Sequence, residues 1–214
     1  MKSISIIFIA ISLTACIDSV ELDSISLSSQ EKDFVPYNQK QKIRFVHSNG
    51  YEFDFVVNRV THAYGRYYQT PMDFIRGGDY VRYQTKSAKL TSLYPKIDII
   101  IETGRLYDPF IEKINSDGSK ETLLNIDMKE LTISINNSST TLYYNHKLIF
   151  DSAHNNNSRR YDSINIHGKT YYNAIESFFN SYNDSVYSSI GSVLFNSKGL
   201  IQIKLSKNET YSIL

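Results

Sequence analysis

The stretch GLIQIKL, residues 199–205, indicates most clearly which fold class the chain adopts. Its side chains alternate between apolar and polar, so Leu200 should share a face with the glutamine and the lysine, opposite Ile201 and Ile203. A period of two residues is typical of a half-buried β-strand. The preceding residues 196–199 carry a turn signal, which predicts a hairpin with the strand before them. The carboxyl-terminal part of the chain therefore indicates antiparallel β-structure.

The same pattern recurs along the chain. Ser48-Asn49-Gly50 is a turn signal that should fold Ile43–Val46 onto Tyr51–Val60. Helix is scarce, although residues 172–182 could form one instead of a strand, because three of their apolar side chains recur every four residues. Further strands are expected at residues 80–94, 96–103, 110–114, 121–126, 130–136, 142–150, 163–166, 170–179, 186–195 and 210–213. Regular turns at this spacing predict an all-β fold, either an antiparallel sandwich or a curved, barrel-like sheet.

Composition supports a single β-rich domain at residues 38–214. The chain has 214 residues, with 17 tyrosines and 11 phenylalanines, and aromatic side chains favour strands. No proline- or glycine-rich linker divides the chain after residue 37, so one domain with little helix is expected. With 23 basic and 22 acidic residues, the chain lacks the positive field that nucleic-acid binding requires. Nucleic acid is therefore not expected as a partner.

Residues 1–15, MKSISIIFIAISLTA, have the proportions of a secretory signal peptide. Lys2 supplies a positive charge, and the uncharged run from Ile4 to Ala15 that follows is shorter than the roughly 20 residues needed to cross a bilayer. The alternative is a buried first strand or helix, but a charged start followed by an abrupt switch to polar residues is unusual for a core element.

The segment ends at Cys16, which is the single cysteine of the chain and has no second cysteine to pair with. Leu13-Thr14-Ala15-Cys16 resembles the lipobox of bacterial lipoproteins. That resemblance implies cleavage before Cys16, attachment of lipid to its sulfur, and a protein anchored to a membrane without crossing it. Each buried methylene of such a lipid contributes roughly 0.8 kcal/mol, and two or three chains together hold a protein almost permanently.

The residues after Cys16 have the composition of a tether. Serine is frequent, and Asp18, Glu21 and Asp23 make the start acidic, so residues 16–37 are expected to form a flexible tether. The carboxyl-terminal passage INIHGKTYYNAIESF (residues 164–178) resembles the ending of uncharacterised envelope lipoproteins of Bacteroidota. This resemblance implies a cell-envelope location in the outer membrane, periplasmic or surface-exposed, and carries no known activity.

Little in the sequence predicts catalysis or metal binding. His146, Asp151 and His154 are the closest group of potential ligands, but their spacing fits no standard metal motif, and solvated loop histidines are the simpler interpretation. No G-x-S-x-G elbow marks a nucleophile. No metal and no cofactor is therefore predicted.

Pairs of carboxylates could lie together on one strand face, as a glycosidase requires. The candidates are Glu52 with Asp54 and Asp98 with Glu102. On an open sheet such residues are more often the solvated side, so no catalytic residue is assigned.

The most unusual internal stretch is HAYGRYYQTPMDFIRGGDYVRYQ, residues 62–84. Tyrosine and arginine are preferred anchors of recognition surfaces because they are large, partly apolar and able to hydrogen-bond. Alternatively, the tyrosines pack a sheet edge and the arginines coat it. The binding candidates within the stretch are Tyr64, Arg66, Tyr67, Tyr68 and Arg76.

These observations predict a membrane-anchored lipoprotein of the cell envelope that acts as a non-catalytic binding or structural module. Its partners would be the membrane, through the lipid on Cys16, and an envelope protein or a glycan. The alternative is an envelope hydrolase whose site is assembled from scattered Asp, Glu and His residues.

Overall fold

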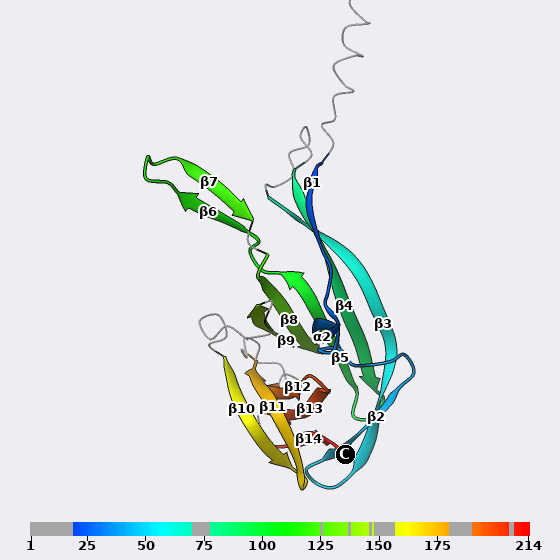
Figure 1. Ribbon diagram of the computed structural model, residues 1–214. Helices are drawn as coiled ribbons and strands as arrows, with labels where there is room; N and C mark the ends of the chain where they lie inside the picture. Colours follow the sequence, from blue (N-terminus) through cyan, green and yellow to red (C-terminus); the bar gives the residue numbers. More distant parts are fainter. Residues whose placement is uncertain are drawn as a thin grey trace, which may run out of the picture.

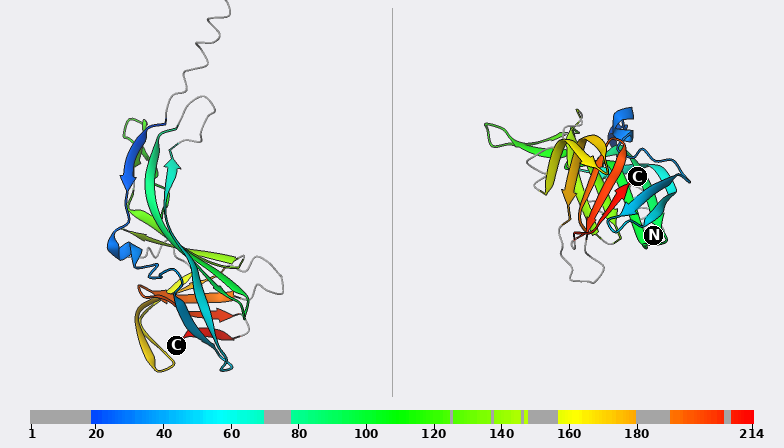
Figure 2. Two further views of the ribbon diagram at one scale, coloured as in Figure 1. Left: turned by 90° about the vertical axis from the view of Figure 1, so that its right-hand side faces the viewer. Right: turned by 90° about the horizontal axis from the view of Figure 1, so that it is seen from below.

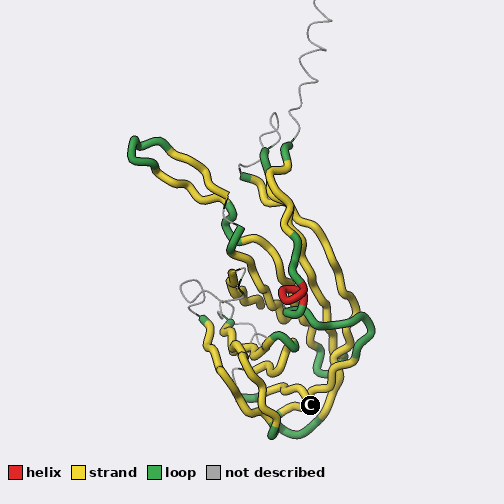
Figure 3. The backbone as a smooth tube through the Cα atoms, in the orientation of Figure 1, coloured by secondary structure: helices red, strands yellow, loops and turns green. Residues whose placement is uncertain are grey.

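The described part of the protein is built mostly from β-strands, which confirms the expected all-β, mainly antiparallel fold (Figures 1 and 3). The computed structural model describes residues 19–69, 78–124, 126–136, 138–145, 147, 157–179, 190–205 and 208–214. The first seven strands are β1 (Glu21–Ile25), β2 (Lys42–His47), β3 (Glu52–Tyr68), β4 (Tyr80–Ser92), β5 (Ile97–Leu106), β6 (Phe110–Ile114) and β7 (Lys120–Leu124). The others are β8 (Met128–Ile135), β9 (Ser138–Asn145), β10 (Ser158–Ile166), β11 (Lys169–Phe178), β12 (Ile190–Asn196), β13 (Gly199–Leu205) and β14 (Thr210–Ile213).

Helix is confined, within the described ranges, to the short α2 (Ser29–Lys32). It begins with a capping box, in which the Ser28 hydroxyl accepts a hydrogen bond from the Glu31 backbone N–H and the Glu31 carboxylate accepts one from the Ser28 backbone N–H. The alternative helix at residues 172–182 does not form over its described part, because β11 continues as a strand to Phe178. In the parts of the chain that the structure describes, no helix is long and apolar enough to span a membrane.

Twelve of the strands form one strongly curved sheet. Eleven follow the order β10-β11-β12-β13-β14-β2-β3-β4-β5-β8-β9, and β1 pairs in parallel with β4. The remaining strands, β6 and β7, form a separate hairpin that projects from the body of the molecule (Figure 1). The sheet curls until its two ends approach each other, which gives the barrel-like form.

The end strand β9 meets β11, the strand next to the other end of the curled sheet, through side chains. The Oγ atoms of Thr140 on β9 and Ser177 on β11 lie 2.7 Å apart, and the Thr140 hydroxyl also lies 3.3 Å from the carbonyl oxygen of Phe178. Among the described residues, β9 and β11 are not neighbours in the sheet ladder. We call this junction the seam; it leaves the barrel nearly, but not fully, closed.

The enclosed core is built from alternating positions of the strands. Phe45, Phe53, Phe55 and Tyr211 pack as a group, with Phe45 and Phe55 edge to face at 5.1 Å between ring centroids. Burying one such side chain stabilises the fold by about 1.5–3 kcal/mol.

The predicted faces of the stretch 199–205 are partly wrong. Leu200 and Ile203 both lie in the main core, whereas Ile201 belongs to a second, smaller cluster with Leu194 and Ala174. The cause is an irregularity in the pairing of β12 with β13. The register shifts just after Leu194, and this shift breaks the strict alternation of side chains along β13.

The segment expected to be a flexible tether is part of the fold from β1 onward. Val35 is fully buried, and the Tyr37 hydroxyl accepts a hydrogen bond of 2.7 Å from the backbone N–H of Leu200. The composition of this segment misled the prediction, because the order of its residues 21–37 depends on contacts with distant parts of the chain. The predicted signal peptide and Cys16 lie outside the described residues.

Candidate functional site

The stretch singled out by its tyrosines and arginines forms a long ribbon. The outer halves of β3 and β4 extend beyond the barrel, alongside β1 (Figures 1 and 2). One edge of β4 is shared by two strands, because β5 pairs with residues 86–92 and β1 pairs with residues 80–83. The ribbon is therefore three strands wide near its end.

Alternation along β3 places three of the predicted binding residues on one face of the ribbon, namely Tyr64, Arg66 and Tyr68. Cross-strand pairing extends this face to β4, since Arg66 lies opposite Arg82 and Tyr68 lies opposite Tyr80. We call these five residues the Tyr/Arg ladder.

Cations and rings interleave along the Tyr/Arg ladder. The Arg82 guanidinium lies 4.2 Å from the Tyr64 ring centroid, and the Arg66 guanidinium lies 4.8 Å from that of Tyr80. The Tyr68 and Tyr80 rings are 5.5 Å apart. Two like charges directly opposite each other are normally unfavourable in a sheet, but here each guanidinium stacks on a ring of the other strand.

The ladder residues differ in exposure. The Tyr64 side chain is 56% exposed, and Arg66 is exposed as well, whereas Tyr80 is only 8% exposed beneath its neighbours. The Tyr80 hydroxyl donates a hydrogen bond of 3.2 Å to Glu21 of β1. The pKa of Arg66 is raised first by its hydrogen bond to Tyr68 and then by nearby Tyr80, so this guanidinium remains a cation. The ladder thus presents an exposed cation, the exposed ring of Tyr64 and the half-buried ring of Tyr68 on a packed base.

Tyr67 does not belong to this surface. Its ring faces the opposite side of the ribbon, 5.9 Å from Phe110 of the projecting hairpin. On that side Gly65 lies under the Tyr83 ring, so closely that a Cβ atom at this position would clash with it. Arg76, the fifth predicted residue, lies outside the described residues. Tyr80 and Arg82 lie within the stretch 62–84 but were not among the predicted binding residues, although the alternation predicted for residues 80–94 indicates that they share a face.

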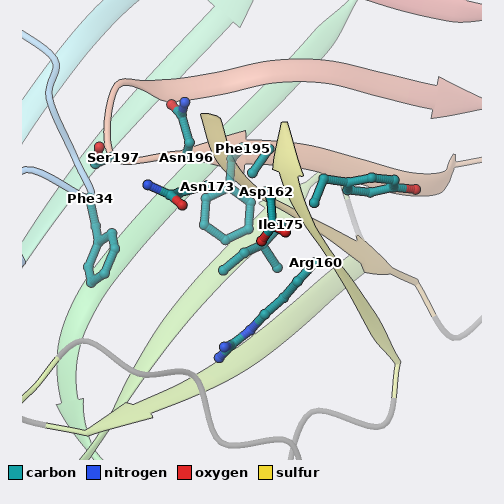
Figure 4. Close-up of a pocket in the computed structure, with 10 residues that line it drawn as sticks. Phe34, Arg160, Asp162, Asn173, Ile175, Phe195, Asn196 and Ser197 are labelled. Carbon is teal, nitrogen blue, oxygen red and sulfur yellow. The ribbon is translucent and has the colours of Figure 1, made fainter. Parts of the chain in front are cut away.

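A cleft of about 410 Å³ opens between Phe34 and the β10–β11 hairpin (Figure 4). One wall is Phe34, whose ring packs edge to face on Tyr144 of β9 at 5.1 Å. The facing walls come from the β10–β11 hairpin and the β12–β13 turn, and the lining residues there are Arg160, Tyr161, Asp162, Asn173, Ala174, Ile175, Phe195, Asn196 and Ser197. The Asn196 side chain is engaged in its own turn, because it donates to the Tyr172 carbonyl and accepts from the Lys198 N–H.

A buried carboxylate, Glu176, lies beside a second hollow of about 380 Å³. It accepts hydrogen bonds from Tyr161 (2.6 Å), Ser192 (2.6 Å) and Lys204 (2.8 Å). Burial alone would raise the pKa of Glu176, but these three donors outweigh it and the pKa is lowered. The group is therefore a saturated carboxylate, poorly suited to donate or accept a proton near neutral pH.

The remaining sequence candidates are accounted for as far as the structure describes them. Arg44 forms ion pairs with Glu52 (3.6 Å) and Asp54 (3.2 Å), and Lys89 pairs with Asp98 (3.4 Å). These carboxylates form part of the charged outer surface of the sheet. His146, Asp151 and His154 lie outside the described residues. Within the described ranges, no three His, Cys, Asp or Glu side chains gather as metal ligands would.

Comparison with known proteins gives no relative from which a function could be transferred: no family model, no curated protein and no solved structure matches this chain.

Proposed function

We propose that the protein is a lipid-anchored, non-catalytic contact module of a bacterial cell envelope. The observation that carries the proposal is the lipobox-like Leu13-Thr14-Ala15-Cys16 at the end of a signal-like segment, in a chain with no other cysteine. The lipid on Cys16 would hold the domain at the outer membrane, and the Tyr/Arg ladder would be its contact surface.

The chemistry of the Tyr/Arg ladder supports a contact role. Its exposed members, Tyr64 and Arg66, combine apolar area, hydrogen-bonding capacity and a fixed positive charge. Because Tyr80 and Glu21 hold the base of the ladder in place, little conformational entropy is lost when a partner is bound.

The hydrolase alternative finds less support. The best-formed polar cluster in the described chain surrounds Glu176, and its lowered pKa makes it a weak base for activating Ser192 or water. The Ser192 hydroxyl already donates its hydrogen to this carboxylate.

The test of the proposed function replaces Cys16 with serine in cells that produce the full chain. We expect the parent protein in the membrane fraction and the Cys16→Ser variant released from it, because no thiol remains to carry lipid. Thr14→Ser, which keeps the lipobox pattern, is the matched control and should behave as the parent. If Cys16→Ser stays in the membrane fraction as the parent does, the lipid anchor is wrong.

A further inference from the structure

We propose that the end of the Tyr/Arg ladder beside β1, formed by Arg66 and Tyr68 above the covered ring of Tyr80, contacts the phosphate-bearing headgroups of the bilayer that holds Cys16. The inference rests on the proposed lipid anchor and adds what the ladder touches. It makes the ribbon a support that sets the orientation of the barrel above the membrane.

The length of chain between the lipid and the ribbon is short. The described structure begins at Ser19, and three peptide steps from Cys16 span at most about 11 Å. The carbonyl oxygen of Val20 accepts a hydrogen bond of 2.9 Å from the Tyr80 backbone N–H. Tyr68 lies on β3, which is one further strand spacing of about 5 Å away, on the other side of β4. A lipid on Cys16 would therefore keep these rings close to the bilayer surface.

The side chains at this end suit a headgroup layer. Tyrosine is enriched at membrane interfaces, where its ring lies among apolar groups and its hydroxyl reaches water. The Arg66 guanidinium can donate two parallel hydrogen bonds to one phosphate. Val20 and Leu22, which are 55% and 46% exposed, add exposed apolar area at this end of the ribbon.

The charges around the ladder specify which lipid chemistry is recognised. Among the described residues here, the three carboxylates of Glu21, Asp23 and Asp79 outnumber the two guanidinium groups of Arg66 and Arg82, so these residues have no excess of positive charge. A surface of this kind gains little from the field of an anionic membrane. The contact should therefore form equally well on phospholipids that carry no net charge, through single guanidinium–phosphate pairs.

The experiment uses the lipidated protein reconstituted in vesicles of phosphatidylcholine and phosphatidylethanolamine, with a nitroxide quencher near the top of the acyl chains. A single introduced cysteine carries a fluorophore, either at Asp79→Cys beside Tyr80 or at Leu93→Cys in the turn that follows β4. Both sites are exposed and neither belongs to the ladder. We expect strong quenching of the first probe and little quenching of the second.

Ladder variants separate contact from mere proximity to the anchor. In the Asp79→Cys background, Arg66→Gln combined with Tyr68→Ser should reduce quenching several-fold. Arg59→Gln, an exposed arginine of β3 outside the ladder, is the matched control and should leave it unchanged. If folding of the double variant is impaired by circular dichroism, Arg66→Gln alone provides the comparison, because its side chain is exposed.

The failures are distinguishable. Labelling of the parent protein at Cys16 would show a free thiol there, which overturns the proposed lipid anchor and the inference together. If Cys16 is blocked and the protein stays on the vesicles, equal quenching at the two probes overturns the inference alone. Unchanged quenching in the ladder variant also overturns the inference alone. In that case the partner that binds the ladder would be a protein.

Discussion

The Nζ atom of Lys129 and the Oε1 atom of Glu31 lie 2.6 Å apart, and both side chains are almost completely buried. The pair joins α2 to β8 across 98 positions of the chain. Because the Ser28 capping box holds the other carboxylate oxygen of Glu31, the ion pair fixes α2 against the barrel.

Replacing Lys129 with methionine should destabilise the protein by about 3–5 kcal/mol, because it leaves the Glu31 charge buried without its partner. Chemical denaturation followed by circular dichroism measures the change. Lys120→Met, which breaks the exposed 2.9 Å pair with Glu112, is the control and should have little effect. Equal effects of the two substitutions would contradict the role assigned to burial.

Glu31 should also make stability depend on acidic pH. Burial acts to raise its pKa, but the hydrogen bonds from Lys129 and Ser28 outweigh it, so the pKa is lowered from its ordinary value of 4.5. The unfolded chain therefore takes up this proton at higher pH than the native protein does. The stabilisation is present above pH 4.5 and is lost as the pH falls through the folded-state value.

Glu31→Gln should accordingly flatten the decline of unfolding free energy below pH 4.5. Glu176, whose pKa is lowered as well, should preserve part of that decline. Denaturation midpoints measured across the acidic range test this, and a variant with the same slope as the parent would exclude Glu31 as a contributor.

Two glycines with positive φ should differ sharply when replaced by alanine. Gly118, in the open β6–β7 turn (φ +80°), has nothing within 4 Å of an added Cβ, so only the backbone penalty of about 1–2 kcal/mol is expected. At Gly104 (φ +96°) the Cβ would clash with the Gln84 carbonyl oxygen and with Leu27. Gly104→Ala should therefore lower the thermal midpoint of unfolding considerably more than Gly118→Ala. Similar midpoints would contradict the close packing of Gly104 against Gln84 and Leu27.

The seam should depend on the hydroxyl pair of Thr140 and Ser177. A double-mutant cycle with alanine at both positions should give a coupling of about 1 kcal/mol. Amide hydrogen exchange along β9 should also accelerate. The pair Thr132–Thr141, 3.2 Å apart within the β8–β9 ladder, is the control, because backbone pairing there continues without it. Unchanged exchange in the seam variants would mean that other contacts close the barrel.

Two tyrosines of the ladder should respond differently to truncation. Tyr80→Ala should destabilise the domain by about 3 kcal/mol, because its ring is covered. Tyr64→Ala should lose only about 0.5–1 kcal/mol, roughly the value of its cation–π contact with Arg82. Thermal unfolding of both variants distinguishes the packed base of the ladder from its exposed contact surface. A large loss for Tyr64→Ala would assign that ring to packing instead.

The strands were predictable wherever local alternation and a turn signal agreed. Ser48-Asn49-Gly50 joins β2 to β3 as expected, and the hairpin β6–β7 forms around Ser116-Asp117-Gly118. Choosing between a sandwich and a curled sheet required the pairing of β14 with β2, which joins residues separated by most of the chain. No local pattern encodes that contact.

The order of residues 21–37 could not be predicted for the same reason. Their apolar side chains follow no clear period, and their structure depends on partners such as Lys129, Leu200 and Tyr80. At the candidate site, the two-residue period of a strand is enough to separate Tyr67 from Tyr64 and Tyr68. The register of β3 against β4 brings Tyr80 and Arg82 into the ladder. This register is set along the whole length of the antiparallel ribbon.

The parallel strand β1 has a practical consequence for producing the domain. It covers the backbone of β4 at residues 80–83, beyond the point where the β5 pairing ends. A shortened chain that begins after Ile25 would leave those backbone N–H and C=O groups as an uncovered strand edge, and such edges template intermolecular pairing. Such a chain should self-associate and aggregate more readily than one that keeps residues 19–25, even though its barrel is intact.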